Sequence, residues 1–168
     1  MILVTGGTGL VGSHLLFELT KADQNIRALY RRTETIEKVK TIFSYYSNNI
    51  DTQFKKIEWV QADLNDVPKL NAAFEGISHV YHCAALISFA PNDYAQLNKT
   101  NTEGTANIVN LCISHSIQKL CYVSSVATMG VDPHKITEET SWKSEYVKNV
   151  YAITKHNAEM EVWRGIQE

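Results

Sequence analysis

The sequence is poor in cysteine and has no clustered metal ligands. Its three cysteines, Cys83, Cys112 and Cys121, are odd in number and include no C-x-x-C pair. This pattern argues against a disulfide-stapled fold and against a zinc site. His79 and His82 lie in or beside one strand-like run without a second group of ligands nearby. We therefore expect them to be core or surface residues, and we predict no bound metal.

The chain also lacks a long apolar run and a dominant charge. No window of about 18 apolar residues occurs, which argues against a membrane span. The formal net charge is −2, so the composition gives no general attraction to nucleic acid or to an anionic membrane. With 168 residues, 44% of them hydrophobic, the chain can bury one sizeable core. We expect a cytoplasmic protein without nucleic-acid or membrane partners.

Short apolar segments alternate with longer helical patterns along the whole chain. Several of the short segments are apolar on both faces, as buried parallel strands are. The predicted strands are residues 2–4, 26–30, 57–60, 80–83 and 120–123. The predicted helices are residues 11–21, 33–46, 67–74, 94–114 and 150–166. This alternation predicts an α/β fold with a doubly wound parallel sheet, formed by one domain over residues 1–168. Residues 130–148 are expected to form a long loop of the kind that borders sites.

A glycine-rich stretch joins the first predicted strand to the first predicted helix. It contains G-x-G-x-x-G from Gly7 and G-x-x-G-x-x-G from Gly6, and both end at Gly12. Such glycines let the backbone approach a pyrophosphate, which the N–H groups at the helix amino terminus then bind. A P-loop is excluded because Ser13 and His14 stand where lysine and serine or threonine are required. A tight turn without a ligand is the alternative interpretation.

The end of the second predicted strand bears on the choice of dinucleotide. NAD-binding proteins of this kind usually carry an acidic residue there, which accepts hydrogen bonds from the adenosine ribose. Here the sequence reads Tyr30-Arg31-Arg32. Guanidinium groups donate paired hydrogen bonds to a phosphate, so the sequence favours NADP over NAD. Two solvated surface arginines are the alternative.

Two further groups of polar residues lie far from the glycines in sequence. The fifth predicted strand runs into Ser124 and Ser125, and ligands bind at the carboxyl ends of strands in a doubly wound sheet. Tyr151 and Lys155 are one helical turn apart, so they share a helix face. A nearby cation stabilises a phenolate, and such a phenol can exchange a proton with a carbinol oxygen.

Together these motifs resemble the amino-terminal part of the extended short-chain dehydrogenases/reductases, the NAD-dependent epimerase/dehydratase family. Other segments that match the family's motifs are Ala62-Asp-Leu64, His82-Cys-Ala-Ala85, Asn101-Thr-Glu-Gly-Thr105 and Gly130 after the two serines. Within the family, Arg31 and the segments 85–89 and 123–130 look most like dihydroflavonol-4-reductase-like members. The resemblance implies a Rossmann fold and an NADP(H)-dependent oxidoreductase that interconverts a ketone and a secondary alcohol.

The resemblance also implies roles for individual residues. Ser125 would hydrogen-bond the substrate oxygen and Tyr151 would exchange the proton. Lys155 would hold the nicotinamide ribose, and Asn101 would anchor its helix and a water. Asp63 would contact adenine. The residues expected to bind cofactor are Gly6, Gly9, Leu10, Val11, Gly12, Arg31, Asp63, Leu64, Ala84, Ala85, Ser124, Tyr151 and Lys155.

Family members are commonly longer than this chain. The resemblance therefore implies that the sheet is truncated before its last strands and that a carboxyl-terminal substrate domain is missing. It also implies that this chain can be inactive alone. It also implies a homodimer that packs through the helices at 94–114 and 150–166. Two alternatives stay open, an NAD-dependent nucleotide-sugar epimerase/dehydratase and a non-catalytic NADP-binding redox-sensing module. Arg31 counts against the first, and the Ser125, Tyr151 and Lys155 set counts against the second.

Overall fold

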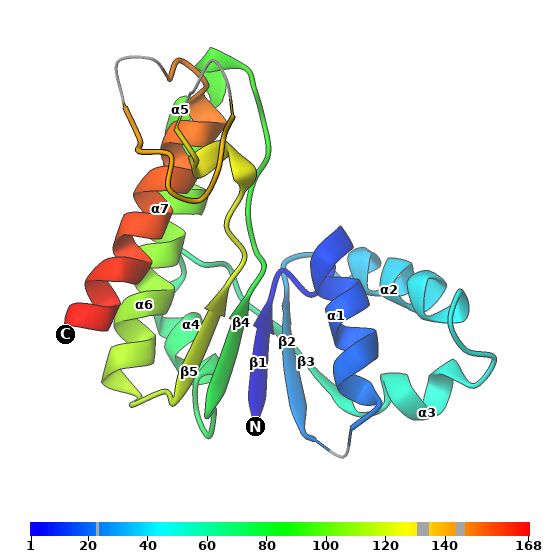
Figure 1. Cartoon of the computed structure of the whole chain (residues 1–168). Helices are drawn as coiled ribbons and strands as arrows, with labels where there is room; N and C mark the ends of the chain where they lie inside the picture. The colour runs from blue at the N-terminus through cyan, green and yellow to red at the C-terminus, as the bar shows by residue number, and fades with distance from the viewer. Residues whose placement is uncertain (23, 131–134, 144–146) are drawn as a thin grey trace.

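In the computed structural model the chain forms a five-stranded parallel sheet with helices on both faces (Figure 1). The structure describes residues 1–22, 24–130, 135–143 and 147–168. The strands, β1 (Ile2–Thr5), β2 (Ile26–Tyr30), β3 (Ile57–Gln61), β4 (His79–His82) and β5 (Lys119–Tyr122), agree with the predicted ones to within one residue at each end. The predicted doubly wound sheet is therefore confirmed.

The order of the strands in the sheet is β3-β2-β1-β4-β5. The chain thus proceeds outward from β1 to β3 and returns to place β4 on the other side of β1. Ile2 of β1 pairs with Ile26 on one side and His79 on the other, both in parallel register. All five strands consequently end at the same edge, and the order reverses between β1 and β4. That reversal is the point at which doubly wound sheets form a ligand-binding crevice.

Each face of the sheet is covered by its own set of helices (Figure 1). Helices α1 (Leu10–Thr20) and α2 (Glu34–Ser44) cover one face, and α4 (Val67–Ala73), α6 (Gly104–Ser114) and α7 (Val150–Gln167) lie on the other. Alternate residues of one strand enter the two cores, since Leu3 packs with Leu70 and Ile108 whereas its neighbour Val4 packs with Leu16. Burial on both faces explains why the central strand β1 is apolar on both sides, whereas β5, at the edge of the sheet, exposes Lys119 and Cys121.

Two helical regions differ from the prediction. A short helix, α3 (Ile50–Phe54), follows α2; its five residues are too few to show a helical period. The predicted helix at 94–114 is helical throughout but is divided into α5 (Tyr94–Leu97), a π-helical stretch η2 (Asn98–Glu103) and α6. A 3₁₀ turn, η1 (Pro91–Asp93), precedes it. Of the loop predicted at 130–148, residues 135–143 are described and contain neither helix nor strand, while 131–134 and 144–146 lie outside the described residues.

The helices and side chains outside the sheet bear on the predictions about membranes, metals and partners. Among the described residues, no helix combines the length and apolarity that crossing a bilayer requires, and no three potential ligands gather around a metal position. Helices α6 and α7 pack against each other. Their exposed apolar side chains are Ile113, Met160, Trp163 and Ile166. The homodimer through these helices and the cytoplasmic location stay predictions.

Helix α7, which carries Tyr151 and Lys155, begins at a side-chain cap. The Asn149 side-chain oxygen accepts the backbone N–H of Tyr151 at 2.9 Å and that of Ala152 at 3.3 Å. These N–H groups have no acceptor within the helix, so the cap stabilises its first turn.

Replacing this cap tests its contribution. Asn149→Ala should lower the free energy of unfolding by about 1 kcal/mol, since two helical N–H groups lose their acceptor. Urea denaturation followed by circular dichroism measures the change. Asn149→Asp keeps an accepting oxygen and should stay close to the unsubstituted chain; an equal loss in both variants would contradict the capping role.

Candidate cofactor and active site

The loop between β1 and α1 needs glycine at specific positions. Gly6 has a φ of +67°, and a Cβ there would lie 2.6 Å from the backbone nitrogen of Ala84. A Cβ at Gly12 would lie 2.2 Å from the Gly6 oxygen. The loop closes through a hydrogen bond of 2.9 Å from the Gly9 N–H to that same oxygen. Of the two glycine spacings, the backbone therefore requires the one that begins at Gly6. A Cβ at Gly7 would meet only side chains, the nearest at 3.0 Å.

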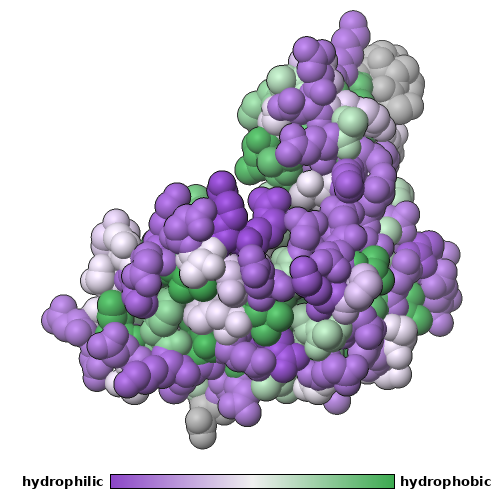
Figure 2. Space-filling view, turned by 180° about the vertical axis from the view of Figure 1, so that it is seen from behind, coloured by the Kyte–Doolittle hydropathy of each residue, from purple (hydrophilic) through white to green (hydrophobic). Residues whose placement is uncertain are grey.

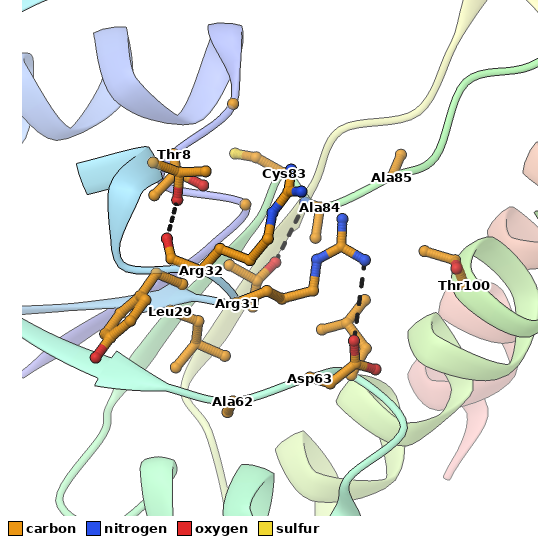
Figure 3. Close-up of a pocket in the computed structure, with 16 residues that line it drawn as sticks. Thr8, Leu29, Arg31, Arg32, Ala62, Asp63, Cys83, Ala84, Ala85 and Thr100 are labelled. Carbon is orange, nitrogen blue, oxygen red and sulfur yellow. Dashed lines mark hydrogen bonds and ion pairs between the residues drawn. The ribbon is translucent and has the colours of Figure 1, made fainter. Parts of the chain in front are cut away.

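A cavity of about 270 Å³ opens beside this loop, at the carboxyl ends of the strands (Figure 3). It lies at the reversal of strand order, next to the amino terminus of α1, whose cap residue Gly9 has no side chain. Four strand ends contribute to its lining: Thr5, Gly6, Thr8 and Gly9 after β1, Leu29 to Arg32 at the end of β2, Ala62 to Leu64 after β3, and Cys83 to Ala85 after β4. Thr35 and Thr100 complete it. A helix amino terminus without a side-chain cap leaves N–H groups and a partial positive charge for an anion.

The cavity brings together about half of the predicted cofactor-binding residues. Those that line it are Gly6, Gly9, Arg31, Asp63, Leu64, Ala84 and Ala85. Leu10, Val11 and Gly12 form the first turn of α1 and are not part of the lining. Ser124, Tyr151 and Lys155 lie elsewhere, after β5 and on α7. Lining residues that were not predicted are Thr5, Thr8, Leu29, Thr35 and Thr100. Of these, Thr5 and Thr8 stand next to the glycines of the loop, which is the one signal that the sequence offered for them.

Two arginines extend over the mouth of the cavity (Figure 3). One Arg31 nitrogen lies 3.9 Å from the Asp63 carboxylate, and both side chains are largely exposed, at 65% and 47%. Arg32 lies 3.6 Å from Glu34, also in an exposed pair. Exposed pairs of this kind contribute little to stability, so both guanidinium groups can turn to a bound anion.

The two serines follow β5 and begin a 3₁₀ turn, η3 (Val126–Thr128). The Ser125 hydroxyl oxygen accepts the Ala127 N–H at 3.2 Å. As an acceptor in this bond, the hydroxyl keeps its own proton free to donate to a ligand. The Ser124 hydroxyl lies 3.5 Å from that of Thr128.

Lys155 is held against the end of β5 by α7. Its side chain is buried, and its ammonium donates to the Val123 carbonyl at 2.8 Å and lies 4.3 Å from the centre of the Tyr122 ring. Burial lowers the pKa of Lys155 to about 8. One turn earlier on the helix, Tyr151 is half-buried and contacts Phe89 edge to face, with ring centres 5.9 Å apart. Because η3 packs against α7, the serine segment and these two side chains belong to one region.

Asn101 connects this region to the segment that follows β4. It lies within the π-helical stretch and is 1% exposed. Its side-chain oxygen accepts the Leu86 N–H at 2.8 Å, and its nitrogen donates to the Leu86 carbonyl at 2.9 Å and to the Thr154 hydroxyl at 3.1 Å. Asn101 therefore anchors α7 to the segment that follows β4.

Three apolar side chains in the segments that follow β4 and β5 are left open to solvent. Ile87, Phe89 and Val126 are 65%, 68% and 76% exposed. We call these three residues the apolar rim. Figure 2 shows this part of the molecule projecting above the rest, with hydrophobic surface on the side that faces the body of the molecule. Water-exposed apolar groups beside polar catalytic candidates favour contact with an apolar ligand.

The comparisons with known proteins cover almost the whole chain. The model described as "NAD dependent epimerase/dehydratase family" matches residues 2–168. A putative dihydroflavonol 4-reductase of Synechocystis sp. is 30% identical over 98% of this chain and 45% of its own length. A 3 beta-hydroxysteroid dehydrogenase/Delta 5-->4-isomerase of Vaccinia virus (strain Copenhagen) is 30% identical over 96% of this chain and 45% of its own.

Solved structures have the same fold. The crystal structure of gox2253 superposes with a TM-score of 0.80 at 29% identity, over 100% of this chain and 48% of that one. The UDP-Glc/GlcNAc 4-epimerase of Campylobacter jejuni gives a TM-score of 0.80 at 23% identity, over 99% and 49%. At that identity the second match supports the fold alone. The chain spans about half the length of the relatives it matches.

The glycine loop gives a matched pair of substitutions. Gly12→Ala should weaken dinucleotide binding at least about tenfold, because its Cβ cannot fit against the Gly6 oxygen without moving the loop. Gly76→Ala is the control: Gly76 also has a positive φ, of +73°, but a Cβ there meets nothing within 4 Å. Both variants should lose stability, whereas only the first should lose binding in a fluorescence titration. Unchanged binding in Gly12→Ala would show that the loop does not hold the ligand.

Proposed function

The chain belongs to the NAD dependent epimerase/dehydratase family, and we propose that the protein is an NADP(H)-dependent oxidoreductase that interconverts a ketone and a secondary alcohol. The observation that carries this proposal is the combination of two neighbouring sites. A cavity beside an enforced glycine loop has two arginines over its mouth. The segment after β4, part of the cavity wall, continues to Leu86, which Asn101 fixes to the helix that carries Tyr151 and Lys155.

The residues around the cavity fit a nicotinamide dinucleotide. The pyrophosphate would lie against Gly6, Gly9 and the first turn of α1, where no side chain intervenes. Arg31 and Arg32 would bind the 2′-phosphate that distinguishes NADP from NAD. Asp63, whose carboxylate lies 3.9 Å from Arg31, and Leu64 would contact the adenine.

The polar groups at the end of β5 suit the reduction of a carbonyl. When bound, the dinucleotide supplies or accepts the hydride. The Ser125 hydroxyl would donate a hydrogen bond to the substrate oxygen, since its bond with the Ala127 N–H does not use the hydroxyl proton. The Tyr151 hydroxyl would give the proton to that oxygen, or take it in the reverse direction. The Lys155 ammonium, fixed by Val123, would stabilise the phenolate and hold the nicotinamide ribose.

The apolar rim indicates the kind of substrate. Ile87, Phe89 and Val126 present apolar surface, and the Phe89 ring touches that of Tyr151. A ketone or alcohol on an apolar framework would cover them and gain the free energy of removing that surface from water. A nucleotide sugar, the substrate class of the epimerase/dehydratase alternative, would bring polar hydroxyl groups to the same surface.

Replacing Arg31 tests the choice of cofactor. Arg31→Ala should raise the Kd for NADPH about tenfold or more and change the Kd for NADH less than about twofold, because only NADPH carries the 2′-phosphate. Lys21→Ala removes an equal charge from the far end of α1, where Lys21 pairs with Glu18, and should change neither value. Equal effects of Arg31→Ala on both cofactors would favour the NAD-dependent epimerase/dehydratase alternative.

Removing one hydroxyl tests the catalytic assignment. Tyr151→Phe should reduce the rate of ketone reduction about 10²- to 10⁴-fold and change the Kd for NADPH far less, because the ring and its contact with Phe89 remain. The rate is followed as NADPH consumption with a panel of cyclic and aromatic ketones. Tyr94→Phe, which alters an exposed tyrosine of α5, is the control. Retained turnover in Tyr151→Phe would contradict the proposed proton transfer.

A further inference from the structure

His82 is a buried titratable residue to which the proposed reaction gives no role. It is the last residue of β4 and is 0% exposed. The residues after it, from Cys83 to Ala85, line the cavity. Its register partner is Thr5, the last residue of β1, which precedes Gly6. The imidazole is thus enclosed between the two strand ends that form the crevice.

The imidazole takes part in a short chain of buried hydrogen bonds. Its Nδ1 lies 2.6 Å from the Thr5 hydroxyl, and its Nε2 lies 3.0 Å from the hydroxyl of Thr105, near the start of α6. Thr5 and Thr105 are themselves buried. The Thr5 hydroxyl also accepts the backbone N–H of Ala84 at 3.3 Å. One side chain therefore links β1, β4 and α6 immediately below the cavity.

The partners of the Thr5 hydroxyl indicate which ring nitrogen carries the proton. This hydroxyl contacts the Ala84 N–H, which can only donate, and Nδ1, which is the acceptor left for the hydroxyl's own proton. The Thr5 hydroxyl thus donates to Nδ1 at 2.6 Å, and Nε2–H donates to the Thr105 hydroxyl at 3.0 Å. In this arrangement the Thr5 hydroxyl accepts from Ala84 and donates to His82 at the same time.

The surroundings of the ring favour its neutral form. Burial lowers the pKa of His82 to about 3, and the Lys155 ammonium acts in the same direction. The Tyr122 ring contacts both groups. Its centre is 5.5 Å from the centre of the imidazole and 4.3 Å from the Lys155 nitrogen. A proton on both ring nitrogens would prevent Nδ1 from accepting the Thr5 hydrogen bond.

The Thr5–Ala84 bond joins the two walls of the cavity where they are closest. A Cβ on Gly6 would lie 2.6 Å from the Ala84 nitrogen, so these walls are already in contact. The Ala84 N–H has its acceptor in Thr5, whose rotation His82 fixes. The walls are thus joined by the backbone bond of 3.2 Å from the Cys83 N–H to the Thr5 carbonyl and by the side-chain bonds that His82, which does not line the cavity, orients.

We propose that His82 is a positioning residue of the cofactor site: as a neutral imidazole with its proton on Nε2, it fixes the Thr5 hydroxyl, and through it Ala84, in the arrangement that a dinucleotide requires. The identity of that ligand rests on the proposed function. The hydrogen-bond arrangement itself is a property of the ligand-free chain and can be tested apart from it.

Cofactor affinity, compared with stability, tests the positioning role. His82→Leu should raise the Kd for NADPH and for NADH about tenfold, the change in equilibrium that corresponds to about 1.4 kcal/mol. Thr5→Val should do the same, and the double variant should be no weaker than either single one, because all three break one chain of bonds. His79→Leu, the same substitution at the other end of β4, is the control and should bind both cofactors normally. Normal binding in His82→Leu, even with a lowered melting temperature, would reduce His82 to a structural role and overturn the proposal.

The tautomer can be measured in the unsubstituted chain, even if His82→Leu does not fold. Nitrogen-15 NMR of labelled histidine should show Nε2 protonated and Nδ1 unprotonated, without titration between about pH 5 and 8. Protonation at Nδ1, or titration in that interval, would overturn the proposal. A chain with this tautomer that binds neither NADPH nor NADH would instead count against the proposed function, and the positioning of a dinucleotide would fall with it.

Discussion

The close contact between the Gly6 loop and the Ala84 backbone determines the arrangement of the rest of the site. It places β1 and β4 side by side at their carboxyl ends, where the strand order reverses. Gly6 has no room for a larger residue, since its φ is positive and a Cβ there would meet the Ala84 nitrogen. The cavity, the free amino terminus of α1 and the path toward Asn101 all start from these two strand ends. Change at this contact would displace both the pyrophosphate loop and the segment that leads to Tyr151.

Two different physical environments meet at that edge of the sheet. Around the cavity, exposed arginines and backbone N–H groups provide positive potential that solvent still reaches. Beyond β5, Lys155 of α7 is buried with a lowered pKa, and the Tyr151 ring contacts the exposed ring of Phe89. The first environment suits an anionic cofactor and the second suits proton exchange with an apolar substrate. Asn101 couples them mechanically, because it bonds both to Leu86 and to Thr154 of α7.

Much of this arrangement follows from local sequence patterns. The five strands could be predicted because each is a short run rich in apolar, β-branched or aromatic residues between helical patterns, and the glycine loop because its spacing reflects a steric requirement. The π-helical stretch could not be predicted, since Asn98–Glu103 has no composition that marks a wider helical turn. Thr35 and Thr100 reach the cavity only through tertiary packing. His82 was expected to be an ordinary core or surface residue; its partners Thr5 and Thr105 are 77 and 23 positions away in the chain, so no local pattern could connect them.

The central claim is that the crevice between β1 and β4 binds a dinucleotide and distinguishes it by the 2′-phosphate. The most direct measurement is the affinity of the unsubstituted chain for NADPH and for NADH at two salt concentrations, followed by cofactor fluorescence. We expect NADPH to bind about tenfold or more tighter than NADH at low salt, with a smaller difference at high salt because exposed guanidinium groups are screened. Tighter binding of NADH, or equal binding of both at every salt concentration, would contradict the claim.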